Sequence, residues 1–190
     1  MYAFDKDELI DLYVNQGLTD RQIGDLKNID RSWIVHLRKK YGIKSRVSNH
    51  EIALSAVIDQ LLDRGFEFKN LKEHNKTANL DLLVNGKHRC KVMSSVASEI
   101  DYYKFSLTTS AGNNTIASED RVILRNGRHR LKFEKVCDYL ILVGINNKRM
   151  SYWILPSDSF SNTLQSISTS HSKDSKYNVY LNNWTPLETN

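Results

Sequence analysis

The sequence predicts an α/β protein in two parts, with three short helices in residues 1–46 and a mixed β-sheet with flanking helices in residues 47–190. Capping boxes and glycines divide the first part into helical segments. In the second part, Asn85-Gly86 separates two apolar runs and predicts a β-hairpin, because both residues of such a turn need positive φ. Apolar runs at 136–145 and 151–155 are typical of buried strands.

Three helices are expected in the first part. Apolar residues at helical spacing predict the first helix over 7–16. The capping box Thr19-Asp20-Arg21-Gln22 opens the second, and Asn28 ends it because asparagine tolerates the left-handed conformation. Asp30 caps a third helix that runs from Arg31 to about Tyr41.

The stretch Ile23-Gly24-Asp25-Leu26-Lys27-Asn28-Ile29-Asp30-Arg31-Ser32-Trp33-Ile34 resembles a helix-turn-helix. Gly24 supplies the small residue where two helices cross, and Asn28 takes the place of the turn glycine. The chain departs from the usual pattern because Leu26 lies one position early and Lys27 stands where leucine is usual. A purely structural three-helix unit is the alternative.

The resemblance implies that the N-terminal half of the third helix enters the major groove of DNA. The side chains expected to face base edges are Arg31, Ser32, Trp33 and His36. A core position for Trp33 is the alternative. Basic residues that follow are expected to contact phosphates or, in the linker, the DNA backbone or minor groove, and these are Arg38, Lys39, Lys40, Lys44 and Arg46.

Basic charge is concentrated in two stretches of a chain whose net charge is +5. Residues 31–46 carry no acid, and residues 121–135 carry only Glu134. The basic side chains of the second stretch are Arg121, Arg125, Arg128, Arg130, Lys132 and Lys135. Two clusters of one sign suggest two contacts with a polyanion, with solvated surface charge as the alternative.

The predicted hairpin, residues 80–95, reads Leu-Asp-Leu-Leu-Val-Asn-Gly-Lys-His-Arg-Cys-Lys-Val-Met-Ser-Ser. It resembles the PD-(D/E)XK, or restriction-endonuclease-like, nucleases, in which an aspartate on one strand is followed by Glu-x-Lys on the next. The resemblance implies Mg²⁺-dependent cleavage of double-stranded DNA, as in restriction or homing endonucleases. By this resemblance Asp81 and Glu51, the latter at the start of a helix from Ser48 to about Arg64, would be the catalytic metal ligands.

Two residues depart from that pattern, because Lys91 stands at the acidic position and Met93 at the lysine position. An ammonium beside Asp81 would pair with it and repel a divalent cation. Three arrangements would retain the chemistry. Lys91 could act in a shifted register with Arg89 in the acidic slot, Lys104 could substitute with Glu99 or Asp101 as ligand, or Asp81 and Glu51 alone could hold one metal.

We therefore expect sequence-specific binding of double-stranded DNA, with cleavage either retained or lost. A non-catalytic DNA-binding regulator and a protein-interaction module are the alternatives. Cutting both strands would usually require two active sites and hence a homodimer. No P-loop, dinucleotide motif or zinc spacing is present, and Ser94-Ser95 lacks a paired base.

The remaining segments carry weaker signals. We expect a short strand at 66–68, a helix or extended piece over 98–107, a loop at 110–115, a short helix from Pro156, and a Ser/Thr-rich loop over 166–176. Cys90 and Cys137 lie in apolar runs and are expected to be buried free thiols in a reducing, cytoplasmic compartment. We expect neither a signal peptide nor a membrane span.

Overall fold

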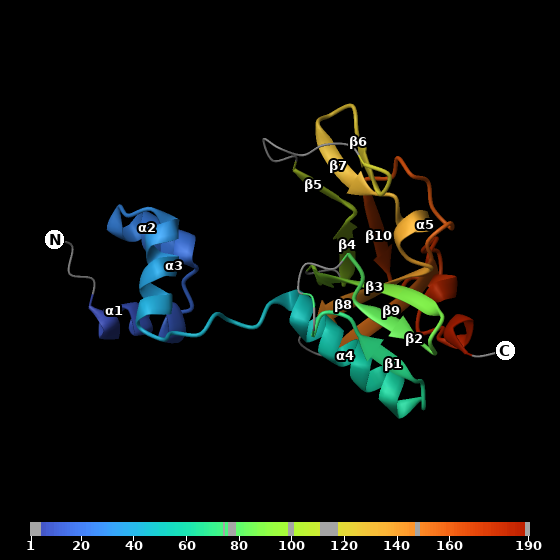
Figure 1. The fold of residues 1–190 in the computed structure, drawn as a ribbon, viewed down its shortest axis with the longest axis horizontal. Helices are drawn as coiled ribbons and strands as arrows, with labels where there is room; N and C mark the ends of the chain where they lie inside the picture. Colours follow the sequence, from blue (N-terminus) through green and yellow to red (C-terminus); the bar gives the residue numbers. More distant parts are fainter. Residues whose placement is uncertain are drawn as a thin grey trace. The chain divides into compact units, whose positions relative to one another are not determined.

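The structure is a computed structural model that describes residues 5–73, 75, 79–98, 101–110, 118–146 and 149–188. The chain separates into two compact units, Met1–Val47 and Ser48–Asn190. Figure 1 shows a first unit made of helices and a second unit made of strands with flanking helices. The expected α/β fold class is confirmed.

The first unit contains the three expected helical segments. The first begins as α1 and continues without a break into one π-helical turn, η1. The bounds are α1 (Lys6–Ile10), η1 (Asp11–Asn15), α2 (Asp20–Lys27) and α3 (Arg31–Lys40). Their apolar faces enclose a small core formed by Leu9, Leu12, Tyr13, Ile23, Ile34 and Leu37.

The turn between α2 and α3 depends on two residues. Asn28 adopts the left-handed conformation, with φ of 54°, and ends α2 as expected. A β-carbon on Gly24 would lie 2.6 Å from the carbonyl oxygen of Ile29, which is closer than real contacts allow. Only glycine fits at position 24, because the backbone of the turn passes directly over α2 there. This agrees with the expectation that Gly24 lies where the two helices cross.

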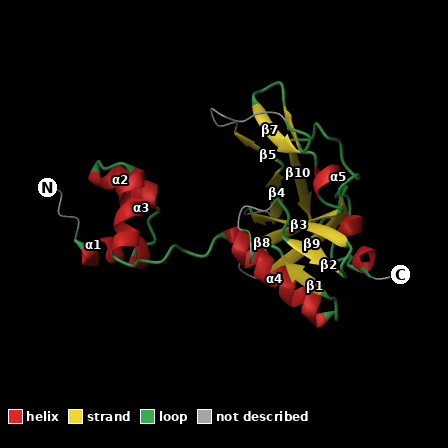
Figure 2. Ribbon diagram, viewed as in Figure 1, coloured by secondary structure: helices red, strands yellow, loops and turns green. Residues whose placement is uncertain are grey.

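The second unit is built on a five-stranded sheet in the order β1-β2-β3-β8-β9. Strands β3 and β8 are parallel, and the other neighbours are antiparallel, so the sheet is mixed (Figure 2). The Asn85-Gly86 turn joins β2 to β3 with φ of 49° and 67°, as expected. The bounds are β1 (Phe68–Asn70), β2 (Leu82–Val84), β3 (His88–Val96), β8 (Tyr139–Asn146) and β9 (Arg149–Pro156).

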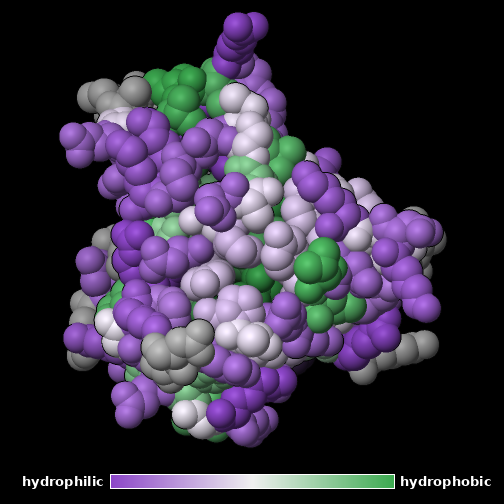
Figure 3. Space-filling view, turned by 90° about the vertical axis from the view of Figure 1, so that its right-hand side faces the viewer, coloured by the Kyte–Doolittle hydropathy of each residue, from purple (hydrophilic) through white to green (hydrophobic). Residues whose placement is uncertain are grey.

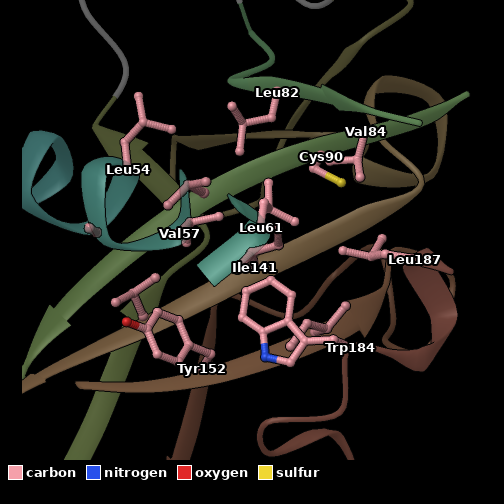
Figure 4. Close-up of a cluster of buried hydrophobic side chains, with 14 residues drawn as sticks. Leu54, Val57, Leu61, Leu82, Val84, Cys90, Ile141, Tyr152, Trp184 and Leu187 are labelled. Carbon is pink, nitrogen blue, oxygen red and sulfur yellow. The ribbon is translucent and has the colours of Figure 1, made fainter. Parts of the chain in front are cut away.

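Each face of this sheet carries its own hydrophobic core. Helix α4 (Asn49–Asp63) lies on one face and buries Leu54, Val57 and Leu61 against Leu82 and Ile141 (Figure 4). On the other face, β8 and β9 pack against α5 (Phe133–Val136) and against two further strands, β4 (Tyr102–Ser106) and β10 (Ser166–Ser170). The buried residues at the centre of this second core are Tyr103, Phe105, Phe133, Trp153 and Ile167.

Two smaller antiparallel sheets complete the second unit. Strand β4 (Tyr102–Ser106) pairs with β10 (Ser166–Ser170), and β7 (Arg128–Leu131) lies between β5 (Thr108–Ser110) and β6 (Arg121–Ile123). In Figure 1 this second sheet projects from the top of the unit. Two single turns, η2 (Asn178–Tyr180) and η3 (Thr185–Leu187), follow β10.

Three weak expectations are settled by these elements. The described part of the segment 98–107 takes the extended alternative, since it forms β4. The loop expected over 166–176 was wrong in its first part, because Ile167 and Thr169 alternate inward and form β10. No helix starts at Pro156, since its carbonyl oxygen accepts both the backbone N–H and the hydroxyl of Ser159 and closes a turn. Residues 111–115 of the loop expected at 110–115 lie outside the described residues.

Candidate functional site

Asp81 lies at the start of the hairpin, and its side chain is fully buried. Its Oδ2 accepts the backbone N–H of Val92 on β3 at 2.8 Å. Three basic side chains surround the same carboxylate. The Nε2 atom of His50 lies 3.1 Å from Oδ1, the Nζ atom of Lys72 lies 3.7 Å from Oδ1, and the Nζ atom of Lys91 lies 3.8 Å from Oδ2. We call these four side chains, Asp81, His50, Lys72 and Lys91, the Asp81 cluster.

The fold brings these residues together from separate elements. His50 lies in the first turn of α4, Lys72 in the turn after β1, and Lys91 on β3. Lys91 also donates to the carbonyl oxygen of Asn79 at 2.7 Å. Burial lowers the pKa of Lys91, and the nearby Asp81 offsets only part of that effect. The sequence alone gave no signal for His50 and Lys72 at this site, because only the fold brings them to Asp81.

Glu51 does not join the Asp81 cluster as a ligand would. Its side chain is exposed, and its Oε2 accepts the backbone N–H of Ser48 at 2.7 Å and the Ser48 hydroxyl at 2.8 Å. This is the capping box that the sequence predicts at the start of α4. Glu51 therefore has a structural role in the first turn of that helix.

The residues at this site do not fit a magnesium ion. Magnesium prefers carboxylate, carbonyl and water oxygens in octahedral geometry. Both oxygens of Asp81 are already engaged with nitrogen groups. Within the described ranges, no group of three or more His, Cys, Asp or Glu residues could hold a metal ion. The arrangement disagrees with the expectation that Asp81 and Glu51 are catalytic metal ligands.

Met93 provides no polar group beside Asp81. It lies two residues after Lys91 on β3, and its half-buried side chain packs against the core that β4 and β10 share with the main sheet. A thioether in this position fills space in the core. Met93 accordingly supplies neither charge nor a proton donor for phosphodiester chemistry.

The residues that could substitute for the missing chemistry do not join the Asp81 cluster where the structure describes them. Arg89 donates to both carboxylate oxygens of Asp138. Lys104 lies on β4 rather than on a helix, and its side chain is exposed. Glu99 lies outside the described residues. None of the described substitutes restores an acidic residue beside Asp81.

Asp101 belongs to a separate polar network. Its carboxylate accepts hydrogen bonds from the Tyr103 hydroxyl at 2.8 Å, the Asn146 amide at 3.0 Å and the Arg149 guanidinium at 2.5 Å. His171 lies 2.9 Å from the same carboxylate. These hydrogen bonds, with a smaller contribution from His171, hold the pKa of Asp101 well below its ordinary value. The network ties β4 to β9 and supplies no ligand to the Asp81 cluster.

Helix α3 of the first unit presents an exposed polar and aromatic face. Arg31, Ser32, Trp33 and His36 are all exposed. The Trp33 side chain is 48% exposed, so the core alternative for this residue is wrong. Its ring stacks on His36, with centroids 5.2 Å apart and planes at 19°. Ser32 additionally donates its backbone N–H to the capping residue Asp30.

Lys39, Lys40 and Lys44 follow this face and are exposed. Together with the residues just described they form the α3 surface, which we define as Arg31, Ser32, Trp33, His36, Lys39, Lys40 and Lys44. This surface combines exposed ammonium groups, which can contact phosphates, with an exposed aromatic ring pair.

Two arginines expected to contact DNA form contacts within the unit itself. Arg38 is buried, donates to both carboxylate oxygens of Asp20 at 2.5 and 2.7 Å, and lies 4.4 Å above the centre of the Tyr13 ring. Arg46 donates to the carbonyl oxygens of Tyr13 and Leu18 and lies over the same ring. Burial of Arg38 contradicts the phosphate contact expected for it, whereas Arg46 stays exposed and its DNA contact stays a prediction.

The second basic stretch maps onto β6, β7 and α5. Arg130 is buried, where it donates to the carbonyl oxygens of Ser161 and Leu164, so it is not available to a partner. In the part of the chain that the structure describes, five other cations of this stretch form no ion pair, namely Arg121, Arg125, Arg128, Lys132 and Lys135. Figure 3 shows a mostly hydrophilic face of the molecule, with hydrophilic side chains at its upper end.

A mixed sheet with a helix on one face, a parallel central pair and an acidic residue at the start of a hairpin is the arrangement expected of a restriction-endonuclease-like fold. The structure of a bacterial homing endonuclease, I-Ssp6803I, is similar with a TM-score of 0.55 over 73% of this chain and 90% of that chain, at 15% sequence identity. At this identity the likeness confirms the fold. No family model and no curated protein matches the chain.

Two remaining expectations concern the whole chain. Among the described helices, none combines the length and apolar character that crossing a membrane requires. Cys90 and Cys137 are buried free cysteines, as expected. Burial is the main cause that raises the pKa of both thiols, which makes them unreactive at neutral pH.

Proposed function

We propose that this protein binds double-stranded DNA in a sequence-specific manner and holds the duplex with a nuclease-like unit that does not cleave it through magnesium. The Asp81 cluster supports the claim that this unit does not cleave DNA through magnesium. The restriction-endonuclease-like pattern places a second acidic residue beside its aspartate, so that the two carboxylates hold the metal ion. Here the buried Asp81 carboxylate faces His50, Lys72 and Lys91 instead.

The α3 surface supports the DNA-binding half. The N-terminal part of a recognition helix normally meets base edges, and the positions after it meet phosphates. Arg31, Trp33 and His36 occupy the first part of α3, and Lys39 and Lys40 its end, with all five side chains exposed. The stacked rings of Trp33 and His36 lie on the surface and not in the core of this unit, so a partner can contact them.

The second unit offers its own contact with the polyanion. Arg121, Arg125, Lys132 and Lys135 belong to one segment around the β6–β7 hairpin and carry positive charge without an acidic partner among the described residues. Hydrated cations of this kind bind phosphates and release counterions. Two separate basic surfaces in one chain fit a long duplex better than a small anionic ligand.

Mg²⁺-dependent cleavage, which would involve a homodimer if both strands were cut, is the second candidate. One observation favours it. Asp81 occupies the place on the hairpin that the restriction-endonuclease-like pattern assigns to its aspartate, in a fold shared with a homing endonuclease. The charge around Asp81 argues against it.

Binding and cleavage can be measured separately. Selection from a random duplex library, followed by fluorescence anisotropy, should yield a preferred sequence whose binding constant falls with salt at a slope of about −0.9 per phosphate contacted. Supercoiled plasmid carrying that sequence should stay intact with Mg²⁺ or Mn²⁺. Absence of salt-dependent binding would refute DNA recognition, whereas metal-dependent nicking would favour the second candidate.

A control variant tests whether the Asp81 cluster is the reason for inactivity. Lys91→Glu combined with Met93→Lys supplies the acidic and basic groups of the restriction-endonuclease-like pattern. Mg²⁺-dependent nicking of the selected plasmid should appear in this double variant. An equally inactive variant that is folded and still binds DNA would contradict the assignment of these positions.

A further inference from the structure

We propose that the stacked rings of Trp33 and His36 recognise the 5-methyl group of a pyrimidine in the major groove, so that the protein prefers thymine at one position of its binding sequence. The inference rests on the proposed DNA binding and names a base feature that α3 recognises. The ligand is duplex DNA that carries a 5-methylpyrimidine, and Trp33 is the specificity-determining residue.

Trp33 is an aromatic residue that the core of the first unit does not use. It is 48% exposed, and it is not a member of the buried cluster that holds this unit together. The buried residues of α3 are Ile34, Leu37 and Arg38, and helical spacing places Trp33 outside the stripe that they form. Because a tryptophan ring buries a large apolar area, an exposed one that has no role in folding favours a contact with a partner.

The stack with His36 holds the indole ring in place. The two ring centroids lie 5.2 Å apart and the ring planes differ by 19°, which is a stacked arrangement. The two residues are three positions apart on one helix, so their side chains are neighbours. A ring that is ordered before binding loses less entropy when it makes a contact. Trp33 therefore presents its apolar surface in a defined orientation, and His36 acts as a positioning residue.

The charge beside the ring pair favours a nucleic acid as the partner. Lys40 follows Trp33 by seven residues, or about two helical turns, and lies on the same side of α3. Residues 31–46 contain no acid. Asp30, which precedes them, accepts hydrogen bonds from the backbone N–H and the hydroxyl of Ser32. An aromatic surface with cations along the rest of the helix is complementary to a polyanion.

Thymine carries an apolar group that the other base edges of the major groove lack. Adenine, guanine and cytosine present only hydrogen-bond donors and acceptors there, whereas thymine adds a methyl group at C5. On α3, Arg31 has the donors that a guanine edge accepts, and the Ser32 hydroxyl already donates to Asp30. Among base edges, the apolar area of Trp33 therefore finds its match in a methyl group.

The test compares thymine with uracil, which differs only by the absence of this methyl group. Each thymine of the sequence obtained by selection is replaced in turn by deoxyuridine, and binding to the full chain is measured by fluorescence anisotropy. One position should lose about fourfold in affinity, which is the effect of removing one methyl group from an apolar contact. At that position 5-methylcytosine should bind about fourfold more tightly than cytosine, because its methyl group occupies the same place.

Variants of the protein connect this loss to the ring pair. Trp33→Ala should bind the thymine and uracil duplexes equally, whereas Trp33→Phe, which keeps an aromatic ring, should retain part of the preference. His36→Ala should reduce the preference without abolishing it, because the indole ring remains but is less ordered. The matched control is Val14→Ala, which removes an exposed apolar side chain of the same unit outside α3 and should leave the preference unchanged.

The outcomes separate this inference from the proposed function. If the selected sequence contains no thymine, or if no uracil substitution weakens binding, the methyl contact is wrong and sequence-specific DNA binding stands. If Trp33→Ala is folded by circular dichroism and keeps both the affinity and the thymine preference, the ring pair faces a different partner, such as a protein, and the inference is overturned. If the unaltered chain shows no salt-dependent binding to DNA, the proposed function fails as well.

Discussion

Replacing Arg38 with methionine should strongly destabilise the first unit without directly removing a DNA contact. The guanidinium is buried, forms two hydrogen bonds to Asp20 and lies over the Tyr13 ring. Methionine keeps most of the side-chain volume but leaves the Asp20 carboxylate, which is 13% exposed, without its partner. Removing one member of a buried pair costs about 3–5 kcal/mol, and we expect about 3 kcal/mol because some water reaches Asp20.

That loss is large for a unit of this size. Domain stability is typically 0.05–0.15 kcal/mol per residue, so residues 1–47 would have about 2–7 kcal/mol in total. The first unit of Arg38→Met should therefore unfold at a much lower urea concentration than in the unaltered chain, while the second unit keeps its unfolding midpoint. Two-dimensional NMR of the full chain measures this directly, because signals from the two units can be followed separately during urea titration.

Two further variants test whether loss of the buried Arg38–Asp20 pair is the cause of the destabilisation. Lys39→Met removes the neighbouring exposed lysine and should cost less than about 0.5 kcal/mol. Adding Asp20→Asn to Arg38→Met removes the unpaired charge and should recover part of the loss in a double-mutant cycle. If Arg38→Met is as stable as Lys39→Met and yet weakens DNA binding, Arg38 contacts DNA and the packing argument fails.

Three other predictions concern recognition, packing and pH. Arg31→Ala should relax sequence preference, whereas Lys40→Ala should weaken binding to all sequences alike, and equal sequence-blind losses from both in a selection assay would contradict the groove assignment. Gly24→Ala should destabilise the first unit by about 1–2 kcal/mol in urea titration, because the new methyl group meets the Ile29 carbonyl at 2.6 Å. Hydrogen bonds hold the pKa of Asp101 below its unfolded value, so its contribution to stability is present above about pH 4 and is lost as pH falls further. Asp101→Asn should therefore flatten the decline of unfolding temperature from pH 5 to pH 2, and an unchanged decline would contradict this.

Local sequence patterns were sufficient to predict where the helices begin and where the hairpin turns. Thr19 and Ser48 accept the backbone N–H three residues on, as their capping boxes predict. The turn residues Asn85 and Gly86 both have positive φ. In these places a residue and its partner lie within a few positions, so the chemistry of the pattern determines the geometry without knowledge of the fold.

Sequence patterns did not predict the role of a residue where its contacting partner lies far away along the chain. Arg38 sits among surface lysines in the sequence, and only packing of α2 against α3 reveals that Asp20 and Tyr13 bury it. His50 reaches Asp81 because α4 begins beside the hairpin, across a separation of 31 residues. Strand β10 has the Ser/Thr-rich composition of a loop. Its alternation of buried and exposed side chains becomes evident only from its pairing with β4.

The Asp81 cluster also indicates why its members must change together. A buried carboxylate needs a positive partner, and Lys91 provides one from the neighbouring strand. Glutamate at position 91 would place two carboxylates side by side and remove that partner, which destabilises the folded state unless a cation binds between them. The Lys91→Glu and Met93→Lys double variant should therefore gain thermal stability on adding Mg²⁺, whereas the unaltered chain should not. Mg²⁺-independent stability in both proteins would show that charge compensation by Lys91 does not determine the character of this site.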